Sequence, residues 1–191
     1  MRHIGLILIC CAALPACVTN RPAAPTMPWE QRVSELEHAN AWQLDGRAAV
    51  ALGAQGWQAT LNWRQADMYA EVHLSGPFGI GALQLRQEPD GLSLNGAPPS
   101  DAVLSQLQDR LGFALPLDNL RFWLLGIPDP GTPSAVTRNA EDRAQHVDQD
   151  GWSVVYDRYM QVSGDWLPAR LTLSRNDVRV RIVIDRWDWH P

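Results

Sequence analysis

Near its middle the chain reads Leu74-Ser75-Gly76-Pro77-Phe78-Gly79-Ile80-Gly81, between two stretches in which apolar and polar residues alternate. A period of two predicts half-buried strands over residues 69–74 and 82–86, which this segment joins as a hairpin. Proline fixes φ and glycine permits positive φ, so Gly76 to Gly79 predict the turn itself. Phe78 is unusual at a hairpin tip. Its ring either folds back onto the core or protrudes as an apolar finger towards a membrane or an apolar partner.

The same alternation continues on both sides of this hairpin and predicts a mainly antiparallel β protein. Further strands are expected over residues 43–52, 57–64, 91–96, 144–148, 152–158, 166–174 and 178–187. Helical spacing replaces the alternation over residues 29–42, 101–111 and 118–125. Ser100 is the expected N-cap of the middle helix and Gly112 its expected end. The apolar face of that helix comprises Val103, Leu104, Leu107 and Leu111.

The helix expected over residues 118–125 is apolar around most of its circumference. Its main face comprises Leu117, Leu120, Trp123 and Leu124. A short helix of this kind must be covered on nearly all sides, either as a core helix or as a plug that occupies a cavity. Roughly nine to eleven strands with interposed helices predict an α+β domain. Its strongly curved sheet wraps round the helices and leaves an apolar pocket if it closes incompletely.

The N-terminus resembles a bacterial lipoprotein signal. An apolar run over residues 4–13, too short to span a bilayer, is followed by Leu14-Pro15-Ala16-Cys17. Residues 1–16 are therefore expected to be removed and Cys17 to become the lipidated N-terminus, the alternative being a plain secretory peptide. The proline-rich residues 17–28 are expected to form a lipidated, flexible tether, and residues 29–191 a single domain.

Composition argues against several classes of function. The formal net charge of −5 disfavours nucleic-acid binding and adsorption to anionic lipid by electrostatics. The sequence contains neither a G-x-S-x-G elbow nor a phosphate-binding glycine loop with a lysine. Its histidines have no metal-ligand spacing, so we expect neither enzymatic activity nor a metal or cofactor. Apolar side chains are abundant instead, because 46% of the residues are hydrophobic and nine are tryptophan.

Several short motifs, taken in order, resemble those of the LolB family of outer-membrane lipoprotein receptors. They are the signal ending at Cys17, Gly46-Arg47, Trp63, Gly76-Pro77-Phe78-Gly79, Leu115-Pro116-Leu117 with Leu120, residues 123–128, residues 151–156, Leu167-Pro168, and residues 179–182 before Trp187. Each motif is weak alone, but together they span nearly the whole expected mature chain. The resemblance implies an incomplete antiparallel β-barrel with a helical lid over a hydrophobic cavity.

The resemblance also implies a function. Such proteins accept lipoproteins from the periplasmic carrier LolA and place them in the inner leaflet of the outer membrane. The expected partners are that carrier, lipoprotein acyl chains and outer-membrane lipid, and the protein is expected to be a monomer. In that family the loop matching Gly76 to Gly79 carries a protruding leucine used in membrane insertion, and Phe78 stands here at that position. Val18 follows the lipid cysteine, in place of the Asp of an inner-membrane retention signal.

The expected cavity lining is the inward set Trp57, Leu61, Trp63, Leu83, Leu85, Trp123 and Val180. Alternation fixes only relative faces, so the whole set could be inverted. The lid helix is expected to use Leu117, Leu120, Trp123 and Leu124. Other functions stay open: a lipid-binding module for free lipid or lipopolysaccharide, a structural envelope lipoprotein with a filled core and no cargo, and, third, a hydrolase.

Overall fold

The computed structural model describes residues 27–76 and 81–190. Cys17, Pro77, Phe78 and Gly79 lie outside these residues, so the expected lipidation site and most of the expected insertion loop stay predictions. In the described part, the strands form one ten-stranded sheet in the order β5-β4-β3-β2-β1-β10-β9-β8-β7-β6. Each neighbouring pair is antiparallel.

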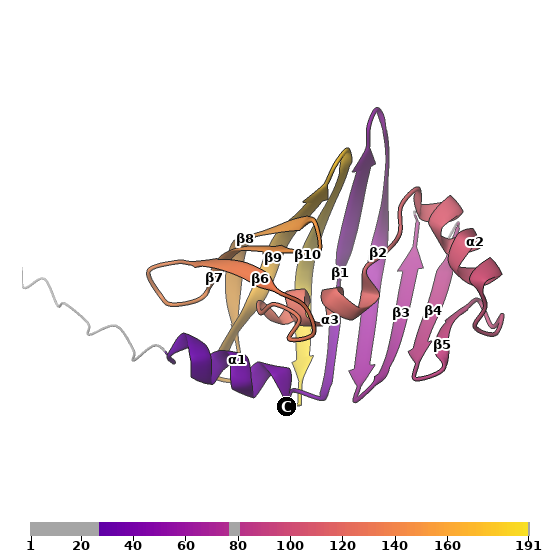
Figure 1. The fold of residues 1–191 in the computed structure, drawn as a ribbon. Helices are drawn as coiled ribbons and strands as arrows, with labels where there is room; N and C mark the ends of the chain where they lie inside the picture. The colour runs from indigo at the N-terminus through magenta and orange to yellow at the C-terminus, as the bar shows by residue number, and fades with distance from the viewer. Residues whose placement is uncertain (1–26, 77–80, 191) are drawn as a thin grey trace, which may run out of the picture.

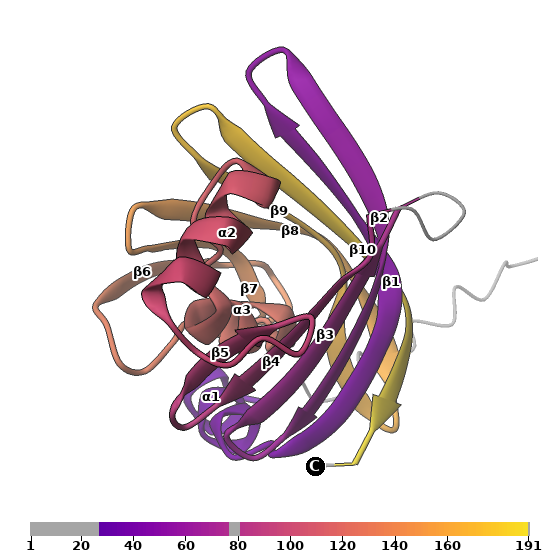
Figure 2. The ribbon, with the colours of Figure 1, turned by 90° about the vertical axis from the view of Figure 1, so that its right-hand side faces the viewer.

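The strands are β1 Ala41–Leu52, β2 Gln55–Ala66, β3 Tyr69–Ser75, β4 Leu83–Glu88, β5 Gly91–Leu94, β6 Ser134–Arg138, β7 Ala144–Gln149, β8 Trp152–Val162, β9 Asp165–Arg175 and β10 Val178–Trp189. The sheet curls into an incomplete barrel, and its edge strands β5 and β6 are not paired with each other where the chain is described (Figure 2). The expected α+β domain with a strongly curved, open sheet is therefore confirmed.

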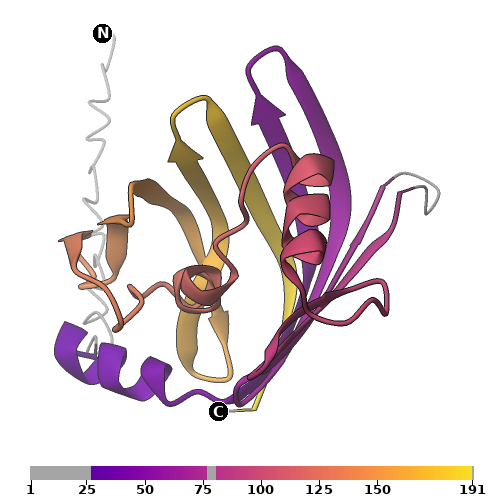
Figure 3. The ribbon, with the colours of Figure 1, turned by 45° about the vertical axis from the view of Figure 1, so that its right-hand side comes forward.

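Among the described residues, three helices accompany the sheet: α1 Trp29–Glu37, α2 Asp101–Leu111 and α3 Leu117–Leu125. The chain that connects the two edge strands supplies α2 and α3, and both lie on the concave side of the sheet (Figure 2). Helix α1 lies across the opposite end of the barrel from the β1–β2 turn (Figures 1 and 3). No helix among residues 27–76 and 81–190 is long and apolar enough to cross a membrane.

Both ends of α2 are capped by the residues predicted from the sequence. The hydroxyl of Ser100 accepts a hydrogen bond from the backbone N–H of Val103 at 3.3 Å, and Gly112 ends the helix with φ of 84°. Leu104, expected on the apolar face, is 51% exposed, because the buried face follows an i, i+4 line through Val103, Leu107 and Leu111.

The hydrophobic core is continuous from one end of the barrel to the other. Its buried members run in sequence from Leu36 to Trp189, so the described segment contains the core that it needs to fold. At the α1 end the ring of Trp42 stacks on Trp63, with centroids 6.0 Å apart, and meets Trp187 edge-on at 5.5 Å. This aromatic group closes one end of the barrel.

Two segments differ from the sequence expectations. The helix expected to reach Trp42 ends at Glu37, because Trp42 and Leu44 already alternate inward as part of β1. Strand β6 was not predicted. It lies at the sheet edge with both faces largely exposed, so its sequence carries no alternation of apolar and polar residues.

Candidate functional site

A small cavity of about 50 Å³ lies between the concave face of the sheet and the chain around α3. Its walls are wholly apolar, and none of its described lining residues carries a titratable side chain. The lining comprises Ala48, Val50, Trp57, Leu61, Trp63, Val72, Leu74, Leu111, Phe113, Leu115, Leu120, Leu124, Val180 and Ile182. Such a cavity has no group for acid–base, nucleophilic or metal chemistry, and it can bind only apolar matter.

Elementary periodicities place these side chains together. On β2 the alternate residues Trp57, Leu61 and Trp63 share the concave face, as strict period-two spacing requires. On α3 the lining residues Leu120 and Leu124 are one helical turn apart and share the face towards the sheet. The floor of the cavity is thus sheet, and its roof is α3 with the segment that precedes it.

An open hollow of about 490 Å³, here called the vestibule, adjoins this cavity. Trp57, Leu74 and Leu111 line both, so the cavity and the vestibule share part of their walls. The vestibule is also lined by Gln58, Ala59, Gly76, Gly81, Leu83 and Arg110. It therefore lies between β2, the β3–β4 connection and the end of α2, at the end of the barrel opposite α1 (Figure 1).

The residues expected from the sequence to line the cavity fall in three places. Trp57, Leu61, Trp63 and Val180 line the cavity itself, and Leu83 lines the vestibule. Leu85 and Trp123 are fully buried but line neither. Whether acyl chains contact any of them stays a prediction.

Sequence reasoning missed the part of the roof formed by Leu111, Phe113 and Leu115. Phe113 and Leu115 lie between two helices, where no periodicity marks a buried face. The lining residues Val50, Val72 and Leu74 were available from the alternation of β1 and β3, since they share the inward phase of their strands.

The four residues expected for the lid all lie on α3 and are buried. The C-terminal end of this helix is held by directional hydrogen bonds. The buried carboxamide oxygen of Gln149 accepts from Trp123 Nε1 and from the backbone N–H of Asp129, both at 2.9 Å. Its Nε2 donates to the carbonyl oxygens of Asp129 and Thr132 at 2.7 and 2.9 Å. This network fastens α3 and the following loop to β7.

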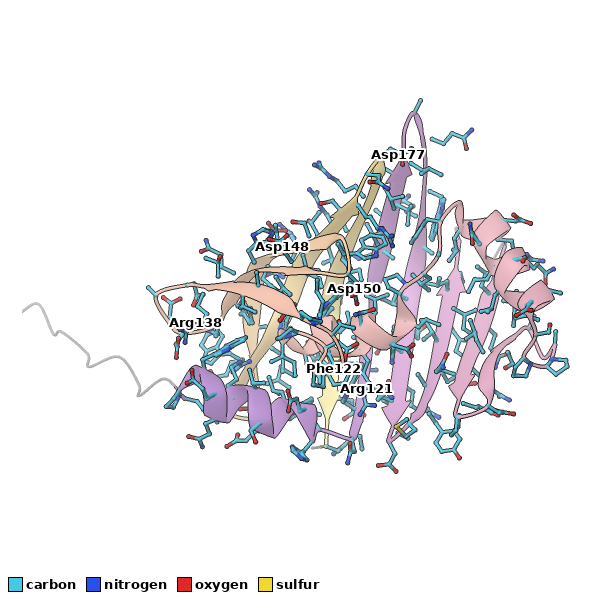
Figure 4. All side chains as sticks on the ribbon, in the orientation of Figure 1. Arg121, Phe122, Arg138, Asp148, Asp150 and Asp177 are labelled. Carbon is cyan, nitrogen blue, oxygen red and sulfur yellow. The ribbon has the colours of Figure 1, made fainter. Side chains whose placement is uncertain are left out.

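A second bond fastens the same end to β8. The hydroxyl of Tyr156 donates to the carbonyl oxygen of Trp123 at 3.0 Å. Burial raises the pKa of Tyr156 well above its ordinary value, so the hydroxyl keeps its proton and stays a donor. On the outer side of α3 the guanidinium of Arg121 lies 5.3 Å from the ring centre of Phe122 (Figure 4). This contact covers Phe122, the side chain that makes α3 apolar on its outer side.

Comparisons with known proteins agree with this geometry. The family model "Outer membrane lipoprotein LolB" matches residues 40–187. LolB from Pseudomonas aeruginosa strain LESB58 is 33% identical over 185 residues, covering 95% of this chain and 89% of its own. LolB from Pseudomonas savastanoi pv. phaseolicola strain 1448A is 32% identical over 201 residues, covering 100% of this chain and 97% of its own.

The fold has a counterpart among solved structures as well. A LolA superfamily protein from Nitrosomonas europaea matches with a TM-score of 0.55 at 8% sequence identity, covering 86% of this chain and 94% of that chain. At this identity the likeness shows the fold alone. The family match extends over most of the chain and over every strand from β1 to β9. The family expected from the short motifs is therefore confirmed, and the chain belongs to the LolB family of outer-membrane lipoproteins.

Proposed function

We propose that this protein accepts lipoproteins from a LolA-type periplasmic carrier and places them in the inner leaflet of the outer membrane. The observation that carries the proposal is the wholly apolar cavity beneath α3, with the vestibule that adjoins it. Its lining offers no titratable group, so the proposed activity is binding and transfer without a covalent step. The protein then acts as a chaperone and not as an enzyme.

The energetics of acyl chains support a relay between two proteins. Exposing an acyl chain to water costs about 0.8 kcal/mol per CH₂ group. A lipoprotein with dozens of such groups would lose tens of kcal/mol by diffusing freely, by the same per-group cost. Transfer should therefore run from the apolar cavity of the carrier directly into the vestibule of this protein. Membrane delivery then runs in the same way, from the vestibule into the bilayer.

The cavity must widen to accept cargo. Its volume of about 50 Å³ is far below the roughly 300–1,000 Å³ of ordinary ligand pockets. The roof segment from Leu111 to Leu115 contributes only apolar side chains to the cavity, whereas α3 is held by side-chain hydrogen bonds of Asn119, Gln149 and Tyr156. We propose that cargo displaces the roof segment while the C-terminal end of α3 stays in place.

We propose that Cys17 carries the acyl anchor, that residues 17–28 act as a tether, and that the domain faces the periplasm. The motive is the signal that ends at Cys17. The mass of the mature N-terminus tests it: an unmodified N-terminus upstream of Cys17, without added lipid, would contradict the anchor.

We further propose that Phe78 inserts into the bilayer during delivery. Its flanking residues Gly76 and Gly81 line the vestibule, which supports a delivery role for the loop between them. Phe78→Glu should leave the melting temperature and uptake from a loaded carrier nearly unchanged. Transfer to liposomes should fall about 100-fold, since a charged side chain inside a bilayer costs about 3 kcal/mol.

Phe78→Leu is the matched control and should preserve most of the transfer, because it keeps an apolar side chain at this position. The alternative, that Phe78 packs on the core, predicts a different result. A large fall in melting temperature together with lost uptake in Phe78→Glu and Phe78→Ala would mean that Phe78 packs on the core, where truncating a buried Phe costs about 3–5 kcal/mol.

The small volume of the cavity favours one other candidate, a structural envelope lipoprotein whose core is simply filled. The two functions differ in dye binding. Lipoprotein supplied by the carrier should change tryptophan fluorescence, since Trp57 and Trp63 line the cavity, and should displace a bound apolar dye. If both signals stay flat at saturating cargo, the filled core is correct. Displacement by free phospholipid but not by lipoprotein would instead favour a module for other lipids.

A further inference from the structure

The convex face of the sheet carries a groove of about 620 Å³ that the proposed transfer of acyl chains does not use. Three arginines from three strands line it: Arg47 on β1, Arg181 on β10 and Arg170 on β9. The other described lining residues are short, amide or aliphatic, and none of them is a carboxylate. The volume lies within the usual range for ligand sites, roughly 300–1,000 Å³.

Strand register brings the arginines together. One row of outward side chains crosses five strands, in the order Arg170, Val183, Arg47, Thr60 and Ser75. Arg181 occupies the next outward position along β10 from Val183 and so flanks this row. Because neighbouring strands lie roughly 4.8 Å apart, the backbones of Arg170 and Arg47 are separated by only about 10 Å across the sheet. Three long cations thus surround a floor of short side chains.

These charges are only partly neutralised. Arg47 forms an ion pair with Asp185, whose carboxylate oxygens lie 2.9 and 3.1 Å from its nitrogens. Arg170 and Arg181 form no ion pair with any other residue in the described part of the chain. A second acid lies nearby on β8, where Asp157 accepts a hydrogen bond from Thr172 at 3.3 Å. The groove therefore keeps an excess of positive charge on a protein whose net charge is −5.

Arginine forks match the geometry of phosphate oxygens, and they bind phosphate through paired, charge-assisted hydrogen bonds. The hydroxyls of Thr60 and Ser75 and the amide of Gln58 add further donors along the groove. A negative overall charge disfavours adsorption of the whole domain to anionic lipid. Within a Debye length of the surface, however, the local cluster of arginines determines the interaction, because more distant charges are screened by salt.

The position of the groove identifies the source of the phosphate. Gln58, Ala59 and Gly76 line both the groove and the vestibule, so the two hollows lie on opposite faces of the same rim of the sheet. We propose that the groove binds the phosphate groups of anionic phospholipids at the bilayer surface, and so holds the vestibule against the membrane. This inference rests on the proposed action at a bilayer, but it does not depend on the uptake of lipoprotein.

The test uses a chain of residues 18–191, which contains the whole core and lacks the expected acylation site. Its binding is measured by flotation with phosphatidylcholine vesicles, with and without phosphatidylglycerol, at low and physiological ionic strength. Wild type should bind the anionic vesicles, and binding should weaken with salt. The double variant Arg170→Gln/Arg181→Gln should bind roughly 30-fold less tightly, as about 1 kcal/mol per basic residue near an anionic surface implies.

The matched control is Arg64→Gln/Arg175→Gln, which removes the same charge at two exposed positions outside the groove. It should bind the vesicles nearly as wild type does. An equal loss of vesicle binding in both double variants would mean that net charge, and not the groove, determines binding. Unchanged vesicle binding by Arg170→Gln/Arg181→Gln would mean that the groove is not the binding site. Either result overturns the inference. Inorganic phosphate should weaken vesicle binding more than chloride of equal ionic strength does, because the arginines recognise phosphate oxygens. Equal weakening by the two anions would also overturn the inference.

A last measurement separates this inference from the proposed function. Uptake of lipoprotein from a loaded carrier should be the same in wild type and in Arg170→Gln/Arg181→Gln, because the arginines do not line the cavity or the vestibule. Uptake lost together with vesicle binding would contradict a role confined to the membrane surface. Uptake absent in wild type would contradict the proposed function and leave the vesicle result standing.

Discussion

The C-terminal end of α3 and the roof segment that precedes this helix are held in different ways. At the C-terminal end, Trp123 and the loop to Thr132 are fastened to β7 and β8 by hydrogen bonds to Gln149 and Tyr156. The N-terminal part of α3 is held as well, because Asn119 Nδ2 donates to carboxylate oxygens of Asp129 and Asp150 at 3.3 and 2.7 Å. The roof segment from Leu111 to Leu115, which precedes the helix, meets the cavity only through apolar side chains. Hydrogen bonds are directional and costly to leave unmade, whereas apolar contacts are non-directional and exchangeable.

This difference teaches how so small a cavity can admit cargo. Moving the C-terminal end would leave the indole N–H of Trp123 and the backbone N–H of Asp129 without partners inside the protein. Moving the roof segment exchanges contacts between apolar side chains for contacts with acyl chains, at little cost in free energy. The C-terminal end of α3, held by hydrogen bonds, is then its fixed end, and the apolar roof segment is the part that yields.

The largest expected effect comes from breaking the fixed end. Gln149→Ala removes the acceptor of the buried indole N–H of Trp123 and of the partly buried backbone N–H of Asp129, and the free energy of unfolding should fall by about 2–4 kcal/mol. Urea unfolding measures the loss. The control is Gln161→Ala at an exposed position on β8, which should change stability very little. Equal losses in the two variants would mean that the network does not hold α3.

Truncating a residue of α3 that lines the cavity should have a second effect besides lost stability. Leu120→Ala should cost about 2–3 kcal/mol, near the lower end for a buried leucine, because the side chain already borders a cavity. It should also enlarge that cavity and strengthen the binding of an apolar dye. Leu92→Ala, a buried position on β5 that does not line the cavity, should destabilise similarly without changing dye binding. Tighter dye binding in both variants would contradict the assignment of the cavity.

The fold class and part of the cavity wall could be predicted from the sequence. Strict alternation in β2 placed Trp57, Leu61 and Trp63 on one face, because a strand's period of two leaves no other arrangement. The fixed end of α3 could not be predicted. Gln149 has a polar side chain in a strand and is expected at the surface, and its burial depends on a loop about twenty residues earlier in the chain.

The convex groove shows a second limit of sequence reasoning. Net charge is a property of the whole chain, and it predicted no affinity for anionic lipid. Arg47, Arg170 and Arg181 are far apart in sequence, and only the register of β1, β9 and β10 brings them together. Local electrostatics of this kind requires the pairing of strands, which periodicity alone does not supply. Cys17 and Phe78 lie outside the described residues, so their roles stay predictions.

The smallest expected effect concerns the second hydrogen bond at the fixed end. Tyr156→Phe removes the donor to the carbonyl oxygen of Trp123 and should lower the free energy of unfolding by about 1 kcal/mol at neutral pH.

Burial raises the pKa of Tyr156 above its ordinary value of 10.0, so the unfolded chain loses this proton before the folded protein does. Wild-type stability is therefore complete below pH 10.0 and falls as pH rises further, by about 1.4 kcal/mol per pH unit for each such tyrosine. Tyr159, whose pKa is also raised by burial, contributes the same slope and remains in the variant. Urea unfolding across this alkaline range should show roughly half the wild-type slope in Tyr156→Phe. An unchanged slope would mean that Tyr156 ionises within the folded protein, and its bond to α3 would then hold nothing in place.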